Sequence, residues 1–156
     1  MAKNRNYDSL DAFVKDLKSD IEDTLSKEVF DEVCDIELKH IQIDVLNRYQ
    51  PQIYERRKIG GIDDSINIVG HVKDMELYVD NVTPFNPGYG TYNSGNNLAD
   101  LINEGEGGKS RLYYDFTGNF IQPTYFLKNT QTEIDKTSRI ERTLNKGLKH
   151  REYDIK

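Results

Sequence analysis

Histidine and cysteine side chains are scarce in this sequence and lie at spacings that do not suggest a catalytic or metal site. His40, His71 and His150 are far apart, and none of them stands at metal-ligand spacing from Cys34, the only cysteine. His40 falls on the apolar stripe of a predicted helix. We therefore interpret it as a packed, hydrogen-bonded side chain rather than as a ligand.

Three other patterns invite a chemical interpretation. Asp63-Asp64 has the ligand type for a divalent cation, although adjacent carboxylates in a turn usually face water. Glu104 and Glu106 flank a glycine and are of the type that performs acid–base catalysis, but solvated carboxylates are ordinary at a helix end. The glycine-rich segment 105–110 lacks the spacing of a phosphate-binding loop. We expect no catalytic, cofactor-binding or metal-binding residue, with a small cytoplasmic enzyme that uses Glu104 and Glu106 as an alternative.

Composition indicates one domain with a thin core. The chain has 156 residues, of which 31% are charged and 36% hydrophobic, and it has no tryptophan. We predict a single domain over 1–156, with flexible ends at about 1–8 and 148–156. A net charge of −6 argues against a general nucleic-acid binder, which needs a basic surface. No apolar run is long enough to cross a bilayer.

The N-terminal third is predicted to be helical. Ser9 or Asp8 supplies a cap, and apolar residues recur at helical spacing from Leu10 to Leu25. Ser26-Lys27 marks a kink or short break. The following run has two apolar stripes, so it should be buried on two sides. The stripes are Val29, Val33, Ile36, His40 and Ile43, and Phe30, Cys34, Leu38, Ile41 and Val45.

The second half alternates strand and helix signals. Two strands, 62–70 and 75–82, are predicted to form a hairpin through His71–Asp74, and 111–116 and 119–122 resemble two more strands. A last helix over 124–147 should end at Gly147. The predicted fold class is α+β, with N-terminal helices and a C-terminal helix packed on a mostly antiparallel sheet of about four strands.

A long loop joins the two halves. Residues Thr83–Asn97 contain two prolines, three glycines and four asparagines, which oppose regular structure. The loop also carries three aromatic side chains that an isolated surface loop does not need: Phe85, Tyr89 and Tyr92. Either they form a local mini-core or they contact a partner.

The stretch Asn96–Thr130 contains the most distinctive motifs. Leu98-Ala99 and Glu104-Gly105 precede a variable loop, and Pro123-Thr-Tyr-Phe-Leu127 opens the last helix. Upstream stand Tyr54-Glu-Arg56 and Gly61-Ile-Asp-Asp-Ser65-Ile66. Together these segments resemble the tail-completion (neck, or head–tail joining) proteins of tailed bacteriophages, over roughly residues 10 to 147. The chain departs from that pattern in having Leu98 where an aromatic residue is usual, and in the long loop before it.

This resemblance implies a structural, non-enzymatic virion protein without a cofactor. Such proteins form a ring, here a hexamer or dodecamer, that joins the DNA-filled head to the tail and lets the genome pass without specific binding. The implied partners are copies of the same chain and the neighbouring neck, portal-side and tail-tube proteins. The implied location is the head–tail junction, after synthesis in the host cytoplasm. A stopper or adaptor ring nearer the portal is one alternative, and a monomeric host-interaction module is another.

The charge distribution suggests how copies would meet. Residues 1–47 carry a net charge of −6, whereas residues 128–156 carry +3. We predict head-to-tail contacts between Asp16 and Asp20 of one copy and Arg139 and Arg142 of the next. The alternatives are that these charges pair within one subunit or simply face solvent.

Overall fold

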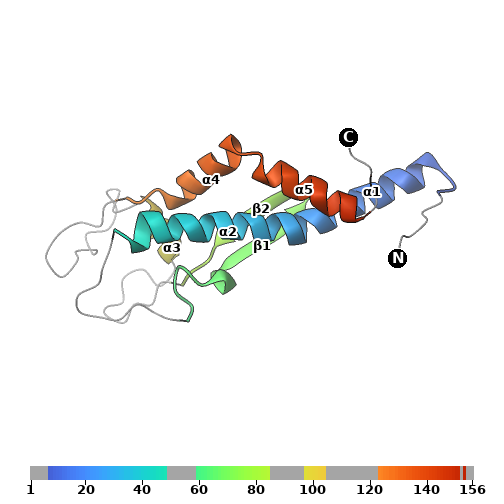
Figure 1. Ribbon diagram of the computed structural model, residues 1–156. Coiled ribbons are helices and arrows are strands. Elements are labelled where there is room, and N and C mark those ends of the chain that lie inside the picture. The colour runs from blue at the N-terminus through green and yellow to red at the C-terminus, as the bar shows by residue number, and fades with distance from the viewer. Residues whose placement is uncertain (1–6, 49–58, 85–96, 105–122, 152, 154–156) are drawn as a thin grey trace, which may run out of the picture.

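A computed structural model describes residues 7–48, 59–84, 97–104, 123–151 and 153. Within these ranges the fold is α+β, as predicted, with a long N-terminal helical rod, one antiparallel hairpin and three further helices. Figure 1 shows the rod running along the molecule beside helices α4 and α5. No helix in the described ranges is both long and apolar enough to span a membrane.

The rod is one continuous helical segment with two π turns. It comprises α1 (Leu10–Thr24), the π segment η1 (Leu25–Val29), α2 (Phe30–His40) and the π segment η2 (Ile41–Leu46). The Ser9 hydroxyl caps it by accepting a hydrogen bond from the Ala12 amide at 3.2 Å. At Ser26-Lys27, where a kink or short break was predicted, the structure has a π turn, which inserts an extra residue without interrupting the helix. At about 1.5 Å per residue the rod is about 55 Å long.

The hairpin consists of β1 (Ile68–Lys73) and β2 (Glu76–Asn81), preceded by the 3-10 turn η3 (Ser65–Asn67). Its register pairs Ile68 with Asn81 and Lys73 with Glu76. The hairpin prediction is confirmed, but its turn lies at Asp74 and Met75 rather than at 71–74. Both turn residues have positive φ, 53° and 62°, as a type I′ turn requires. The described sheet has two strands, and the predicted strands 111–116 and 119–122 lie outside the described residues.

The C-terminal part contains two helices where one was predicted. They are α4 (Phe126–Lys136) and α5 (Arg139–His150). They are separated at Thr137, whose φ of −114° and ψ of 146° are those of extended backbone. Gly147 is not a terminator, because it lies buried inside α5 and the helix continues to His150.

One end of the rod closes an apolar core. Ile41 and Val45 of the rod pack with Ile62, with Ala99 of α3 (Leu98–Glu104) and with Phe126, the first residue of α4. The core thus unites both halves of the distinctive Asn96–Thr130 stretch. Of the two neighbouring aromatic residues at this corner, Tyr125 is 52% exposed and Phe126 is 0% exposed.

One side chain of α3 and one from the segment just before α4 hold these two helices together. The Asn103 Oδ1 accepts a hydrogen bond from the Leu127 amide at 3.0 Å, which caps the N-terminus of α4 from another segment. The Thr124 hydroxyl donates to the Ile102 carbonyl at 2.9 Å. These bonds satisfy backbone groups at the end of α3 and at the start of α4, so the two helices are fixed relative to each other.

Both apolar stripes of the rod are covered by other parts of the same chain. One side of the rod contacts β1 and β2, and another side contacts α4 and α5. Glycine permits two of the closest approaches. A Cβ on Gly70 would stand 2.5 Å from the Phe30 ring, and a Cβ on Gly147 would overlap the methyl group of Thr24. Ile43, placed on the first stripe by its spacing, is instead 46% exposed.

Candidate interaction surfaces

A seam of charged side chains joins the rod to α4 and α5. Glu133 of α4 is its centre and accepts hydrogen bonds from Lys39 Nζ at 2.6 Å and from Arg139 Nη1 at 3.2 Å. Its Oε2 also lies 3.1 Å from His40 Nε2. The hydrogen bond from Lys39 is the main cause that lowers the pKa of Glu133. The seam therefore favours a charged Glu133 and holds α4 against the rod.

His40 lies between two carboxylates of this seam. Its Nδ1 is 3.0 Å from Asp44 Oδ2, and its Nε2 contacts Glu133. Asp44 also accepts from Asn129 Nδ2 at 2.9 Å. Only a ring protonated on both nitrogens donates to both carboxylates at once. The prediction that His40 is a packed, hydrogen-bonded side chain is confirmed.

Arg139 has its partners within its own chain. Its Nε donates to Glu32 Oε1 at 2.5 Å, in addition to its bond with Glu133. The pKa of Arg139 is raised; burial opposes this rise, and the hydrogen bond that Arg139 donates to Glu32 is the largest cause that favours it. For Arg139, the geometry corresponds to the within-subunit alternative.

Arg142 lies one turn further along and faces outward. Its Nε donates to the Ser138 carbonyl at 3.2 Å. Among the described residues, no carboxylate lies within ion-pair distance of Arg142. Two arginines three residues apart on one helix thus have different environments, because α5 packs on the rod through the Arg139 side.

The two acidic contact candidates on α1 are engaged by tyrosines. Asp16 Oδ2 accepts from the Tyr7 hydroxyl at 2.5 Å, and Asp20 Oδ2 accepts from the Tyr153 hydroxyl at 2.9 Å. Burial and the bond to Asp20 raise the pKa of the Tyr153 phenol. These contacts tie Tyr7, which precedes α1, and Tyr153, which follows α5, to α1. Sequence patterns did not indicate this role.

The aromatic loop candidates Phe85, Tyr89 and Tyr92 lie outside the described residues. The two ends of their loop are described and lie together. Pro84 and Asn97 form an antiparallel bridge, and the Leu98 amide donates to the Thr83 carbonyl at 2.9 Å. The loop between them therefore leaves and re-enters the fold at one place.

A buried polar cluster supports the place where this loop leaves and re-enters the fold. Glu37 of α2 is 3% exposed and accepts a hydrogen bond from Asn81 Nδ2 at 2.9 Å. Burial is the largest cause of the raised pKa of Glu37. Asn81 Oδ1 also accepts from the Thr83 hydroxyl at 2.5 Å. Sequence reasoning missed Glu37, whose signal was its position one turn from the buried Cys34.

Cys34 is buried, as its position on a stripe predicts. It is 8% exposed, and its pKa is raised to about 11 by burial and by the nearby charge of Glu37. A buried thiol that stays protonated is a poor nucleophile.

The acidic residues considered for catalysis or metal binding either cap a turn or face solvent where the structure describes them. Asp64 accepts hydrogen bonds from the Gly60 amide at 2.7 Å and the Ile66 amide at 3.2 Å, so it caps the turn η3. Glu104 is exposed at the end of α3, and Glu106 lies outside the described residues. Across the described ranges, no group of three His, Cys, Asp or Glu side chains is placed to hold a metal ion.

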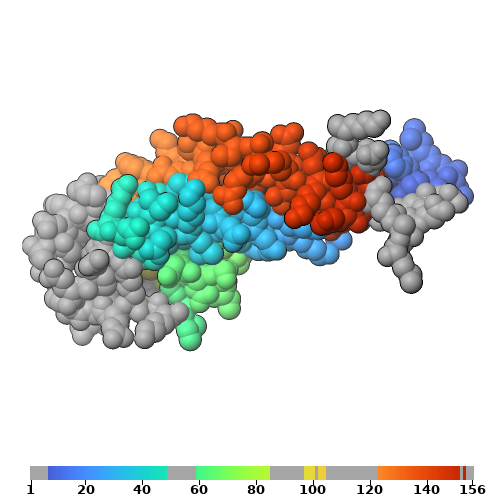
Figure 2. All heavy atoms as spheres, viewed as in Figure 1, coloured from blue at the N-terminus to red at the C-terminus, as the bar shows by residue number. Residues whose placement is uncertain are grey.

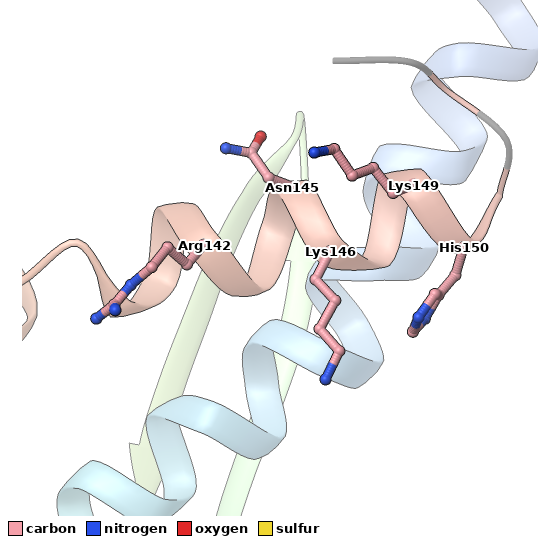
Figure 3. A pocket seen from close by; sticks show the side chains of 5 residues that line it. All are labelled: Arg142, Asn145, Lys146, Lys149 and His150. Atoms are coloured by element: carbon pink, nitrogen blue, oxygen red, sulfur yellow. The ribbon is translucent and has the colours of Figure 1, made fainter. Parts of the chain in front are cut away.

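The outer face of α5 carries a row of basic side chains, which we call the α5 basic face. Figure 3 shows these side chains projecting from α5, where they line a hollow. The prediction that the helix ends at Gly147 left two of them, Lys149 and His150, off the helix. The hollow is lined by Arg142, Asn145, Lys146, Lys149 and His150.

Comparison with known proteins places this chain in a family. It matches the protein-family model YomN over residues 6–150. Because that match covers most of the chain, the protein belongs to the YomN family. The family is phage-derived, of the SPbeta-prophage type, so this is a bacteriophage-related protein. No curated protein and no solved structure shows significant similarity to it.

Proposed function

We propose that this protein is a structural component of the phage neck. It would assemble with copies of itself into a ring, a hexamer or dodecamer, that joins the DNA-filled head to the tail and lets the genome pass. The observation that carries the proposal is membership of a phage-derived family over residues 6–150. The resemblance of the Asn96–Thr130 stretch to tail-completion proteins supplies the specific role within the virion.

The packing of that stretch supports the proposal. Ala99 and Phe126 come from its two halves, and both are 0% exposed in the same core. Asn103 and Leu127 then link the halves by a cap. These contacts explain why both halves of the motif occur together, since each supplies half of one packed corner.

Exposed apolar side chains also support a partner-dependent role. Ile66 and Leu10 are 74% and 75% exposed, and Val69, Tyr78 and Val82 on or beside the hairpin are more than 40% exposed. Single exposed apolar residues are normal, but several on one hairpin are typical of a surface that becomes covered on assembly. A protein that functions in a ring buries such side chains only after its neighbours arrive.

Inactivation of the gene in its phage would test the proposal. We expect DNA-filled heads and complete tails that remain separate, because the connecting layer is missing. Adding the purified protein to this lysate should restore joined particles and infectivity, and gold-labelled antibody should mark the head–tail junction. Normal joined particles in the mutant would refute the neck role.

The same mutant separates the alternatives. Heads that lose their DNA would favour a stopper or adaptor ring nearer the portal. Normal particles that fail only on certain hosts would favour a host-interaction module. For a conduit, we also expect the purified protein to bind duplex DNA weakly, because a chain of net charge −6 has little basic surface to release counterions.

A further inference from the structure

The basic residues of α5 divide into two groups. Arg139 and Arg151 face the rod and pair with Glu32 at 2.5 Å and with Glu28 at 2.8 Å. The cationic residues of the α5 basic face are exposed, and Lys146, Lys149 and His150 have no hydrogen-bond or ion-pair partner in the described part of the chain. Like charges three or four residues apart on a helix repel each other, so this face destabilises its own helix in the isolated chain.

The rod has a matching division among its acids. Glu28 and Glu32 face α5 and are paired, whereas Asp31 and Asp35 are exposed and stand one turn apart. No cation of the described chain pairs with Asp31 or Asp35. We call these two residues the α2 acidic stripe. It is a second like-charged pair at a repulsive spacing.

The two surfaces complement each other in charge and scale. The α5 basic face covers about two helical turns, roughly 12 Å, and the acidic stripe covers one turn, roughly 6 Å. Contact between them would relieve the repulsion within each helix. The two surfaces lie on different elements and do not pair within the chain. A contact in which the face of each copy meets the stripe of the next copy is heterologous, as a ring requires.

We propose that the α5 basic face of one copy docks on the α2 acidic stripe, Asp31 and Asp35, of the next copy. This inference rests on the proposed ring function and replaces the contact predicted from sequence. Arg139, Asp16 and Asp20 already have partners in their own chain, and only Arg142 of that predicted set remains at the interface. Opposite charges on the two surfaces select the partner and the register more than they add affinity.

Charge reversal on each surface provides the test. Variant A carries Lys146→Glu and Lys149→Glu, and variant B carries Asp31→Lys and Asp35→Lys. We expect each variant alone to self-associate at least about tenfold more weakly than the unmodified chain in sedimentation velocity at low salt, because like charges then face each other. Mixed in equal amounts, A and B should assemble in alternation, since the basic face of B fits the acidic stripe of A and the reversed face of A fits the reversed stripe of B. A chain with all four changes should self-associate again.

A matched control has the same change in net charge at another surface. Lys128 and Lys136 are exposed on α4, so Lys128→Glu with Lys136→Glu should leave self-association unchanged. Circular dichroism of every variant should show intact helices, which separates loss of contact from loss of folding.

Three results would overturn the inference. These are an unmodified chain that stays monomeric at high concentration, variants A and B that self-associate normally, and an equimolar mixture that remains unassociated. Salt-sensitive binding of duplex DNA that is lost only in variant A would assign the basic face to nucleic acid instead. Failure here with correct labelling at the head–tail junction would leave the neck role standing. Normal pairing of A with B, together with normal joined particles in the gene mutant, would refute the neck role alone.

Discussion

Gly147 is the position where a single added methyl group tests the packing of α5 on the rod. In an exposed helix interior, glycine to alanine stabilises by about 1 kcal/mol. Here the new Cβ would stand well under 3.0 Å from the Thr24 Cγ2, closer than real Cβ contacts come. Thr24 is 0% exposed, and its hydroxyl donates to the Asp20 carbonyl at 2.7 Å. The methyl group cannot rotate away without breaking that bond, so α5 must move outward.

The expected magnitude follows from two opposing terms. Overpacking of a well-filled contact costs about 1–3 kcal/mol, and the gain in helix propensity offsets about 1 kcal/mol of it. We therefore expect Gly147→Ala to lower the free energy of unfolding by about 1–2 kcal/mol. Thr24→Ser keeps the hydroxyl and removes the methyl group, which should cost about 0.5–1.5 kcal/mol on its own. The double variant moves one methyl group from the rod to α5 and should approach the stability of the unmodified chain.

Urea denaturation followed by far-ultraviolet circular dichroism would measure all four proteins. The decisive quantity is the coupling free energy of the double-mutant cycle, expected to be at least about 1 kcal/mol and favourable. The slope with urea should stay the same, since the native fold is unchanged. If Gly147→Ala instead stabilises by about 1 kcal/mol with no coupling to Thr24, α5 does not pack against the rod at this distance.

Three further predictions concern the buried and paired groups. Cys34 should resist a thiol reagent at pH 8 until urea unfolds the chain, and rapid labelling of the native protein would contradict this. The free energy of unfolding should also fall as pH rises from 9 toward 11, because the thiol ionises at lower pH in the unfolded chain than in the folded one. Cys34→Ser should cost about 1–3 kcal/mol in urea melts. The Glu37→Gln variant should gain stability relative to the unmodified chain as pH rises above 4.5, because the raised pKa of Glu37 makes the folded state hold its proton more tightly than the unfolded state. A difference in unfolding free energy between the two proteins that is constant between pH 4 and 7 would refute this. Arg139→Glu should lower the free energy of unfolding by about 1–3 kcal/mol, whereas Arg142→Glu should change it by less than about 0.5 kcal/mol; equal effects of the two would disprove their different environments.

The helical rod and the hairpin were predictable because each has a local pattern. Two apolar stripes predicted burial on two sides, and alternation predicted the strands. An irregularity near Ser26-Lys27 was predictable, because the apolar stripes change position along the rod there. That it is a π turn at Leu25–Val29 was not predictable, since the same change of position also fits a break in the helix. The hairpin turn was misplaced because Asp74-Met75 has a residue in its second position that rarely adopts positive φ.

The division of the last helix had a sequence signal that its apolar pattern obscured. Thr137 and Ser138 resemble a helix boundary, but Ile134 and Ile140 on either side are also spaced as on one continuous helix. Pairing of the charged residues had no such signal. Whether Arg139 or Arg142 meets an acid depends on the rotation of α5 about its axis, and a sequence alone does not state that rotation.

Contacts inside the chain determine which cations are left for assembly. Glu28 and Glu32 bind Arg151 and Arg139 at the two ends of α5, and Gly147 between them permits close approach to the rod. Two ion pairs on one side of a helix fix its rotation, and the glycine fixes its distance. With both fixed, the remaining basic side chains stay exposed. Figure 2 shows the α5 surface (red) uncovered on this face of the molecule. A change at Gly147 that lifts or turns α5 should therefore weaken self-association without altering any residue of the basic face, and the Thr24→Ser partner change should restore both stability and self-association together. Recovery of stability without recovery of self-association would separate the packing of α5 from the contact between copies.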